Sequence, residues 1–108
     1  MRATKALLQN ALRLTMFSRP NCSLCDDAKV VVRRVMENRP AEYKEYDVMN
    51  AGKERWKEIY EVDTPVVHID PMGSLSDGET TAQAKKLMHR FTEAQLQAAM
   101  DAVEHEAK

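Results

Sequence analysis

The alternation of apolar and polar positions predicts a strand–helix–strand unit in the first half of the chain. Residues 13–17 alternate in this way and predict a strand, which the segment S-R-P-N ends. Residues 43–48 predict a second strand. Between them, from residue 23 to about residue 38, apolar residues recur at helical spacing and would lie on one face: Ala28, Val31, Val32, Val35 and Met36.

A second helix is predicted after Asn50, which would serve as its N-cap. Trp56, Ile59 and Tyr60 would then share one face of that helix. A turn at residues 63–65 leads into residues 66–69, whose β-branched side chains predict a third strand.

A long polar stretch, residues 71–83, follows the third strand. It is long for a hairpin loop, so we expect it to be either mobile or functional. Residues 85–91 predict either a fourth strand or the start of a helix. Thr92 and Gln95 have the spacing of a capping box. The apolar stripe behind them predicts a final helix to about residue 104, with Leu96, Ala99, Met100 and Val103 on its inner face.

The resulting order is β-α-β-α-β-β-α. The first two strands would be parallel, with a right-handed crossover through the first helix, and the last two would form an antiparallel hairpin. We therefore predict an α/β fold: a four-stranded mixed sheet with helices on both faces. One domain would span residues 13–104, after an N-terminal extension of residues 1–12.

Composition limits the classes of function. The chain has 108 residues and 44% hydrophobic residues, which fits one globular domain. Its 16 basic and 17 acidic residues give a net charge of -1. A nucleic-acid partner is not expected, because such proteins usually carry a basic excess. No apolar run approaches the roughly 20 residues of a membrane-spanning helix, so no membrane partner is expected either.

The first twelve residues contain Arg2 and Lys5 and no acidic residue. This is the composition of a mitochondrial targeting helix. An ordinary N-terminal extension or a misassigned start site gives the same pattern. We expect an intracellular protein, in the cytoplasm or alternatively in the mitochondrion.

The two cysteines are the most informative feature of the sequence. Cys22 and Cys25 lie between the first strand and the first helix. The free N–H groups and positive dipole end of a helix stabilise a thiolate, and Arg19 would add a positive charge. Cys22 is therefore the candidate attacking thiolate, and Cys25, one turn further along, the candidate resolving thiol.

Two other interpretations of the cysteines stay open. The thiols could be buried and inert, or they could form half of a zinc site. Zinc usually takes four ligands, and the chain has no second C-x-x-C pair and no histidines at ligand spacing. No metal site is therefore predicted.

With these motifs the sequence resembles the glutaredoxins of the thioredoxin-fold superfamily, from about Leu12 to Val103. The resemblance rests on L-T-M-F-S-R-P-N-C-S-L-C and on D-T-P-V-V-H-I. Closer still, the sequence looks like a small eukaryotic glutaredoxin-like group that shares P-V-x-H and M-H-R stretches, here at 65–68 and 88–90. It implies a thioredoxin-like fold.

The resemblance also implies roles for individual residues. Cys22 matches the nucleophile and Cys25 the resolving cysteine. Arg19 stands where a basic residue contacts the glycine carboxylate of glutathione. Pro65 matches a cis-proline that faces the active site, and the backbone of Thr64 would pair with the cysteinyl part of glutathione.

The sequence departs from the glutaredoxin pattern at one place. Glutaredoxins carry Gly-Gly at the end of the fourth strand, where the γ-glutamyl end of glutathione lies against the backbone; His89 and Arg90 stand there in this chain. Glu93 would repel a carboxylate, whereas Arg90 could bind one through paired hydrogen bonds. Arg90 is therefore a further candidate substrate-binding residue.

The sequence predicts a dithiol thiol–disulfide oxidoreductase acting on protein disulfides or glutathione mixed disulfides. Glutathione or a thioredoxin-type protein would be the reductant, with no bound cofactor, and the protein would be a monomer. One alternative is a redox-inactive thioredoxin-fold binding module that uses residues 71–83 and the His89–Arg90 pair. A second is an iron–sulfur carrier that holds a cluster between two chains through Cys22.

Overall fold

The computed structural model describes residues 12–72 and 79–107, so all of the N-terminal extension except Leu12 lies outside the described residues. The element order is the predicted one. In chain order, the elements are β1 (Leu12–Ser18), α2 (Ser23–Asn38), β2 (Glu42–Asp47), α3 (Glu54–Tyr60), β3 (Val66–Pro71), β4 (Lys85–Met88) and α4 (Glu93–Ala107).

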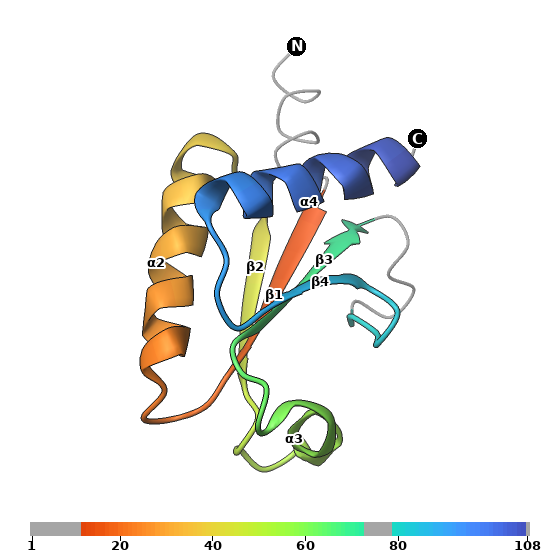
Figure 1. Ribbon diagram of the computed structural model, residues 1–108. Helices are drawn as coiled ribbons and strands as arrows, with labels where there is room; N and C mark the ends of the chain where they lie inside the picture. The colour runs from red at the N-terminus through yellow and green to blue at the C-terminus, as the bar shows by residue number, and fades with distance from the viewer. Residues whose placement is uncertain (1–11, 73–78, 108) are drawn as a thin grey trace.

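The four strands form one mixed sheet in the order β2-β1-β3-β4. The β1 and β2 strands are parallel, as the crossover through α2 requires, and β3 is antiparallel to both β1 and β4. This confirms the predicted α/β fold with a four-stranded mixed sheet. Figure 1 shows α2 and α4 packed beside the sheet and α3 at its lower end, where β1 runs into α2.

One face of the sheet forms the larger apolar core with α2 and α4. Side chains alternate along a strand, so every second residue of β1 and β3 points to this face. The core residues are Leu12, Leu14, Met16, Ala28, Val32, Val35, Val67, Ile69, Leu96, Ala99, Met100 and Val103. Both helices bury one apolar stripe here, as their periodicity predicts. Within the described ranges, no helix is long and apolar enough to cross a membrane.

On the opposite face of the sheet, the side chains change from charged at one end of the strands to apolar at the other. The pairing register places three rows side by side across it: Glu42, Arg13 and Asp70; then Lys44, Thr15, His68 and Lys86; then Tyr46, Phe17, Val66 and Met88. The apolar row packs with Val48 and with Trp56 and Tyr60 of α3 in a second, smaller core. The helix therefore covers the end of the sheet that is nearest Cys22.

A buried hydrogen-bond chain connects α3 to the polar row. Thr80 donates its hydroxyl proton to Asp70 at 2.6 Å, so its oxygen is left to accept from His68 Nδ1 at 2.9 Å. His68 Nε2 then accepts from the Tyr60 hydroxyl at 2.6 Å. His68 is fully buried against aromatic rings, including Phe17. Burial first, and then the charge of Lys86, lower the pKa of His68 to about 4.

The predictions for α3 were partly wrong. Its N-cap is Lys53, without a side-chain cap, and not Asn50. The Asn50 carbonyl instead accepts a backbone bond from Lys53 in a turn, and Gly52 takes a φ of 86° there. Ile59 is 42% exposed. The two-turn helix presents only the Trp56–Tyr60 stripe to the sheet, and Ile59 lies about 100° from Tyr60 around the helix axis.

The structure also decides between the strand and the helix predicted as alternatives for residues 85–91. Residues 85–88 form β4, so the strand alternative holds, but the strand ends at Met88 and not at Phe91. His89 follows with a left-handed φ of 64°, which turns the chain out of the sheet. Both bonds of the capping box form, Thr92 N–H to Gln95 Oε1 and Gln95 N–H to Thr92 Oγ1. The α4 helix extends to Ala107.

Candidate active site

Cys22 is the N-cap of α2, with an extended backbone (φ -115°, ψ 100°). Its Sγ accepts a hydrogen bond from the backbone N–H of Cys25 at 3.1 Å. This is the place where a hydroxyl or carboxylate usually caps a helix, and here a sulfur takes it. The two cysteines form a disulfide, with Cα atoms 5.2 Å apart, within the ordinary range for such bonds.

The two sulfurs differ in accessibility. Cys22 is half-buried, whereas Cys25 lies in the first turn of α2 and is 1% exposed. When the pair is reduced, only Cys22 is open to a disulfide that arrives from solvent. The N-terminal N–H groups of α2 favour its thiolate, while Asp26 in the first turn acts against it. The predicted roles, Cys22 as the attacking thiolate and Cys25 as the resolving thiol, require this difference in accessibility.

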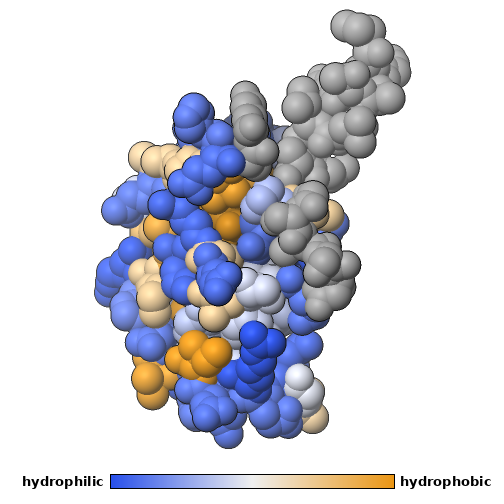
Figure 2. All heavy atoms as spheres, turned by 90° about the vertical axis from the view of Figure 1, so that its right-hand side faces the viewer, coloured by the Kyte–Doolittle hydropathy of each residue, from blue (hydrophilic) through white to orange (hydrophobic). Residues whose placement is uncertain are grey.

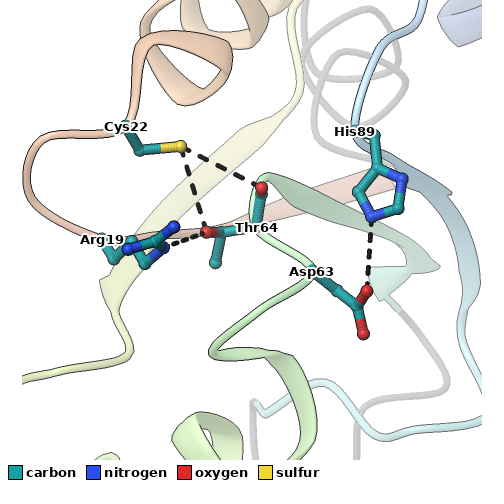
Figure 3. Close-up of polar contacts among 5 residues, drawn as sticks. All are labelled: Arg19, Cys22, Asp63, Thr64 and His89. Carbon is teal, nitrogen blue, oxygen red and sulfur yellow. Dashed lines mark hydrogen bonds and ion pairs between the residues drawn. The ribbon is translucent and has the colours of Figure 1, made fainter.

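Thr64 lies directly opposite Cys22, as Figure 3 shows. Cys22 Sγ is 3.9 Å from Thr64 Oγ1 and 4.0 Å from Thr64 O. Arg19 Nε donates to Thr64 Oγ1 at 3.2 Å. The Thr64–Pro65 peptide bond is cis, as the resemblance implies. The structure thus brings together Arg19, Cys22, Thr64 and Pro65, which come from two segments more than 40 residues apart.

His89 borders the same site from the end of β4. Its backbone N–H donates to Pro65 O at 2.8 Å, and its Nε2 lies 3.4 Å from Asp63 Oδ1. In Figure 3 the imidazole points toward Asp63, on the far side of Thr64 from Cys22. A left-handed φ favours glycine, so the backbone retains the conformation of a glycine position although a histidine stands there.

A groove of about 710 Å³ runs beside the Cys22 sulfur. Its lining includes Arg19, Thr64, His89 and Arg90, so every predicted substrate-binding residue except Pro65 borders it. The sequence analysis did not identify Val62, which also lines the groove and is 85% exposed. It also missed Asp63, which holds the His89 ring. In the sequence, Val62 and Asp63 show only the pattern of a turn.

The histidines give no support for a metal site. Within residues 12–72 and 79–107, no three His, Cys, Asp or Glu side chains are grouped so that they could hold a metal ion. His68 uses both ring nitrogens in the buried chain to Tyr60 and Thr80. His89 contacts Asp63, and His105 lies on the last turn of α4.

The comparisons with known proteins agree with this architecture. The family Glutaredoxin-like domain (DUF836) matches residues 13–101, which include both cysteines and all the predicted substrate-binding residues. No curated protein sequence matches the chain.

Solved structures with similar folds include several thioredoxins. A thioredoxin variant from Halobacterium salinarum NRC-1 superposes with a TM-score of 0.62 and 19% identity, covering 92% of this chain and 80% of its own. Fasciola hepatica thioredoxin gives 0.58 and 17%, covering 94% and 90%. A structural-genomics target from X. campestris gives 0.58 and 20%, covering 82% and 96%. At these identities the likeness establishes the fold, which is thioredoxin-like.

Proposed function

The chain belongs to the glutaredoxin-like domain family, and from that premise we propose that it is a dithiol thiol–disulfide oxidoreductase. Cys22 would be the nucleophile and Cys25 the resolving thiol. The observation that carries the proposal is the geometry of the pair: an accessible sulfur at the N-terminus of α2 and a buried partner within disulfide distance.

The reaction would proceed in two exchanges. The Cys22 thiolate attacks one sulfur of the substrate disulfide, forming a mixed disulfide and releasing the other sulfur as a thiolate that takes up a proton. Cys25 then loses its proton and attacks Cys22 Sγ. This forms the Cys22–Cys25 disulfide and releases the second substrate thiol. The substrate gains two electrons and the protein is oxidised by two.

A second set of thiols must return the protein to its dithiol form. Two molecules of glutathione, or one reduced thioredoxin-type dithiol, balance this step: they reduce the Cys22–Cys25 disulfide and leave as a disulfide. The sequence resemblance supports glutathione. Arg19, which would bind its glycine carboxylate, lies at the groove beside Cys22.

Thr64 would align the substrate with the Cys22 sulfur. Its carbonyl lies 4.0 Å from Cys22 Sγ, and Arg19 bonds its hydroxyl. An extended chain with a reactive cysteine could bond to the backbone groups of Thr64, directly before β3, while its sulfur meets Cys22.

A redox titration tests the proposal. The protein is equilibrated in glutathione buffers of graded potential, and the Cys22–Cys25 dithiol is counted by thiol labelling. Reduction of bis(2-hydroxyethyl) disulfide is followed in a separate sample without glutathione, with the pre-reduced Cys22–Cys25 dithiol as the electron donor. We expect a two-electron transition and measurable turnover, both lost in Cys22→Ser. A dithiol that titrates without turnover of any disulfide would contradict the proposal and favour a redox-inactive binding module.

The same samples test the iron–sulfur alternative. A carrier that binds a cluster through Cys22 would show visible absorbance as isolated and would migrate as a dimer. We expect a colourless protein that migrates as a monomer.

A further inference from the structure

The groove beside Cys22 carries features that a small neutral disulfide would not use. Resting on the proposed function, we propose that it selects polypeptide disulfides in which a carboxylate side chain neighbours the reactive cysteine. Arg90 would pair with that carboxylate, and Val62 would contact an apolar side chain of the same segment.

Arg90 is a cation that forms no hydrogen bond or ion pair with the described part of the chain. Three other arginines of the described residues form ion pairs: Arg13 with Glu42, Arg34 with Glu93, and Arg39 with Asp101 and Glu104. Arg90 lines the Cys22 groove, is exposed, and forms no ion pair within residues 12–72 and 79–107. Its guanidinium group is therefore free to bind a planar carboxylate through two hydrogen bonds.

Two carboxylates lie close to the groove, but neither of them forms an ion pair with Arg90. Asp63 contacts His89. Asp27 lines an adjoining cavity of about 120 Å³ together with Arg90, but the two side chains form no ion pair, and Asp27 is exposed to solvent. Arg19 adds a second positive charge to the Cys22 groove. The charge that the groove presents to a substrate is thus positive.

Val62 supplies the apolar part of the recognition. Among residues 12–72 and 79–107, the exposed large apolar residues are Met49, Ile59 and Val62, and Val62 is the most exposed of the three, at 85%. It lines the groove with the half-buried side chains of Leu24 and Met88. Figure 2, which views the molecule from the right-hand side of Figure 1, shows a largely hydrophilic surface with separate apolar patches low on the molecule and in its upper half.

These features favour a polypeptide over glutathione. Glutathione offers carboxylates, but none of its three residues carries an apolar side chain that could cover Val62. The His89 side chain also stands where a bare backbone would receive the γ-glutamyl end of glutathione. A longer segment can place a cysteine at Cys22, an acidic side chain at Arg90 and an apolar one at Val62.

Charge-swapped peptides test the inference. Two acetylated hexapeptides, each with one leucine and one cysteine, differ only in the residue after the cysteine, which is Glu or Lys. Each is presented as a mixed disulfide with 2-mercaptoethanol to the pre-reduced protein, whose Cys22–Cys25 dithiol supplies the two electrons, and the second-order rate constant of reduction is measured as kcat/KM. We expect the wild-type protein to prefer the Glu peptide by about fivefold, the scale of an exposed ion pair, and Arg90→Glu to reverse the order.

Arg33→Glu is the matched control. Arg33 is exposed on α2 and lines a different groove, between α2 and β2, so the same change of charge there should keep the wild-type preference. For the apolar contact, Val62→Ser should lower kcat/KM for the leucine peptide several-fold more than for a peptide with glycine in its place.

The outcomes separate this inference from the proposed function. No turnover of 2-hydroxyethyl disulfide by the wild-type protein would overturn both. Turnover of this neutral disulfide without a preference between the Glu and Lys peptides would overturn the inference alone. A glutathione mixed disulfide that is reduced faster than both peptides, with Arg90→Glu leaving the peptide order unchanged, would also overturn it.

Discussion

The backbone N–H of Cys25 donates a hydrogen bond to Cys22 Sγ at 3.1 Å, so the two cysteines have unequal roles even before any substrate arrives. Cys25 supplies the amide that caps a charge on Cys22, and its own sulfur is 1% exposed. A hydrogen bond to the charged form of a group favours that form. The capped and accessible sulfur should therefore be the thiolate.

Alkylation measures the difference in thiol reactivity between Cys22 and Cys25. With the reduced protein near pH 7 and limiting iodoacetamide, we expect Cys22 to be labelled first, because the thiolate is the reacting form and only Cys22 is open to solvent. Peptide mass mapping reads the site. Preferential labelling of Cys25 would contradict the assigned roles.

Single substitutions separate the two exchange steps. Cys22→Ser should abolish turnover, because no accessible sulfur remains to attack the substrate disulfide. Cys25→Ser should still attack and then accumulate the mixed disulfide, which intact-mass spectrometry detects. Accumulation in Cys22→Ser, and not in Cys25→Ser, would reverse the order of the steps.

Glutathione should be a poor substrate, because side chains stand where glutaredoxins have bare backbone. We expect the wild-type protein to reduce glutathione mixed disulfides more slowly than a typical dithiol glutaredoxin. The difference would correspond to one or two charge-assisted hydrogen bonds of about 1.5–3 kcal/mol each. The double variant His89→Gly, Arg90→Gly should raise kcat/KM for glutathione. His89 already has the left-handed φ of 64° that glycine favours, so the backbone should tolerate the change.

Arg90→Ala alone shows whether the guanidinium replaces the missing backbone contacts. If it does, the substitution should weaken glutathione binding further. Wild-type turnover equal to that of ordinary glutaredoxins, unaffected by Arg90→Ala, would show that the departure from Gly-Gly has no effect on glutathione.

His68 should make the stability of the fold depend on pH. Its pKa is lowered to about 4, chiefly by burial, against an ordinary value of about 6.5. Between these values the unfolded chain binds a proton that the folded protein does not, so the free energy of unfolding falls as pH falls. From pH 7.5 to pH 5 this contribution amounts to about 2 kcal/mol, to be measured by urea unfolding.

The His68→Gln variant should lose that pH dependence, whatever its stability at neutral pH. His105→Gln, the same change on the exposed last turn of α4, should retain it. Equal slopes in the wild-type protein and in His68→Gln would show that His68 titrates normally in the folded state.

The capping box at the start of α4 should contribute measurable stability. Thr92 Oγ1 accepts from Gln95 N–H at 3.1 Å, and this bond is lost in Thr92→Ala. We expect a loss of about 1 kcal/mol in the free energy of unfolding, with most of it recovered in Thr92→Ser. A serine variant as unstable as the alanine variant would assign the effect to the threonine methyl group instead.

Much of the fold follows from local periodicity. The helix at 23–38 and the capping box at Thr92 were predicted at their observed positions, because helix spacing and N-terminal capping involve residues within one or two turns. Asn50 and Ile59 were predicted wrongly for the converse reason. The position of a short helix depends on the turn before it and on the surface that it covers. The residue pattern of the helix itself specifies neither the turn nor the surface.

The sequence by itself determined that two thiols stand between a strand and a helix, since that depends only on neighbours along the chain. The tertiary structure alone decided what faces them. Thr64 reaches the Cys22 sulfur because β3 pairs antiparallel with β1, and His89 reaches Pro65 because β4 pairs antiparallel with β3. The exposed fractions of the Val62 and Arg90 side chains at the groove arise in the same way. They depend on which surfaces the sheet and helices leave uncovered, which no local spacing of residues specifies.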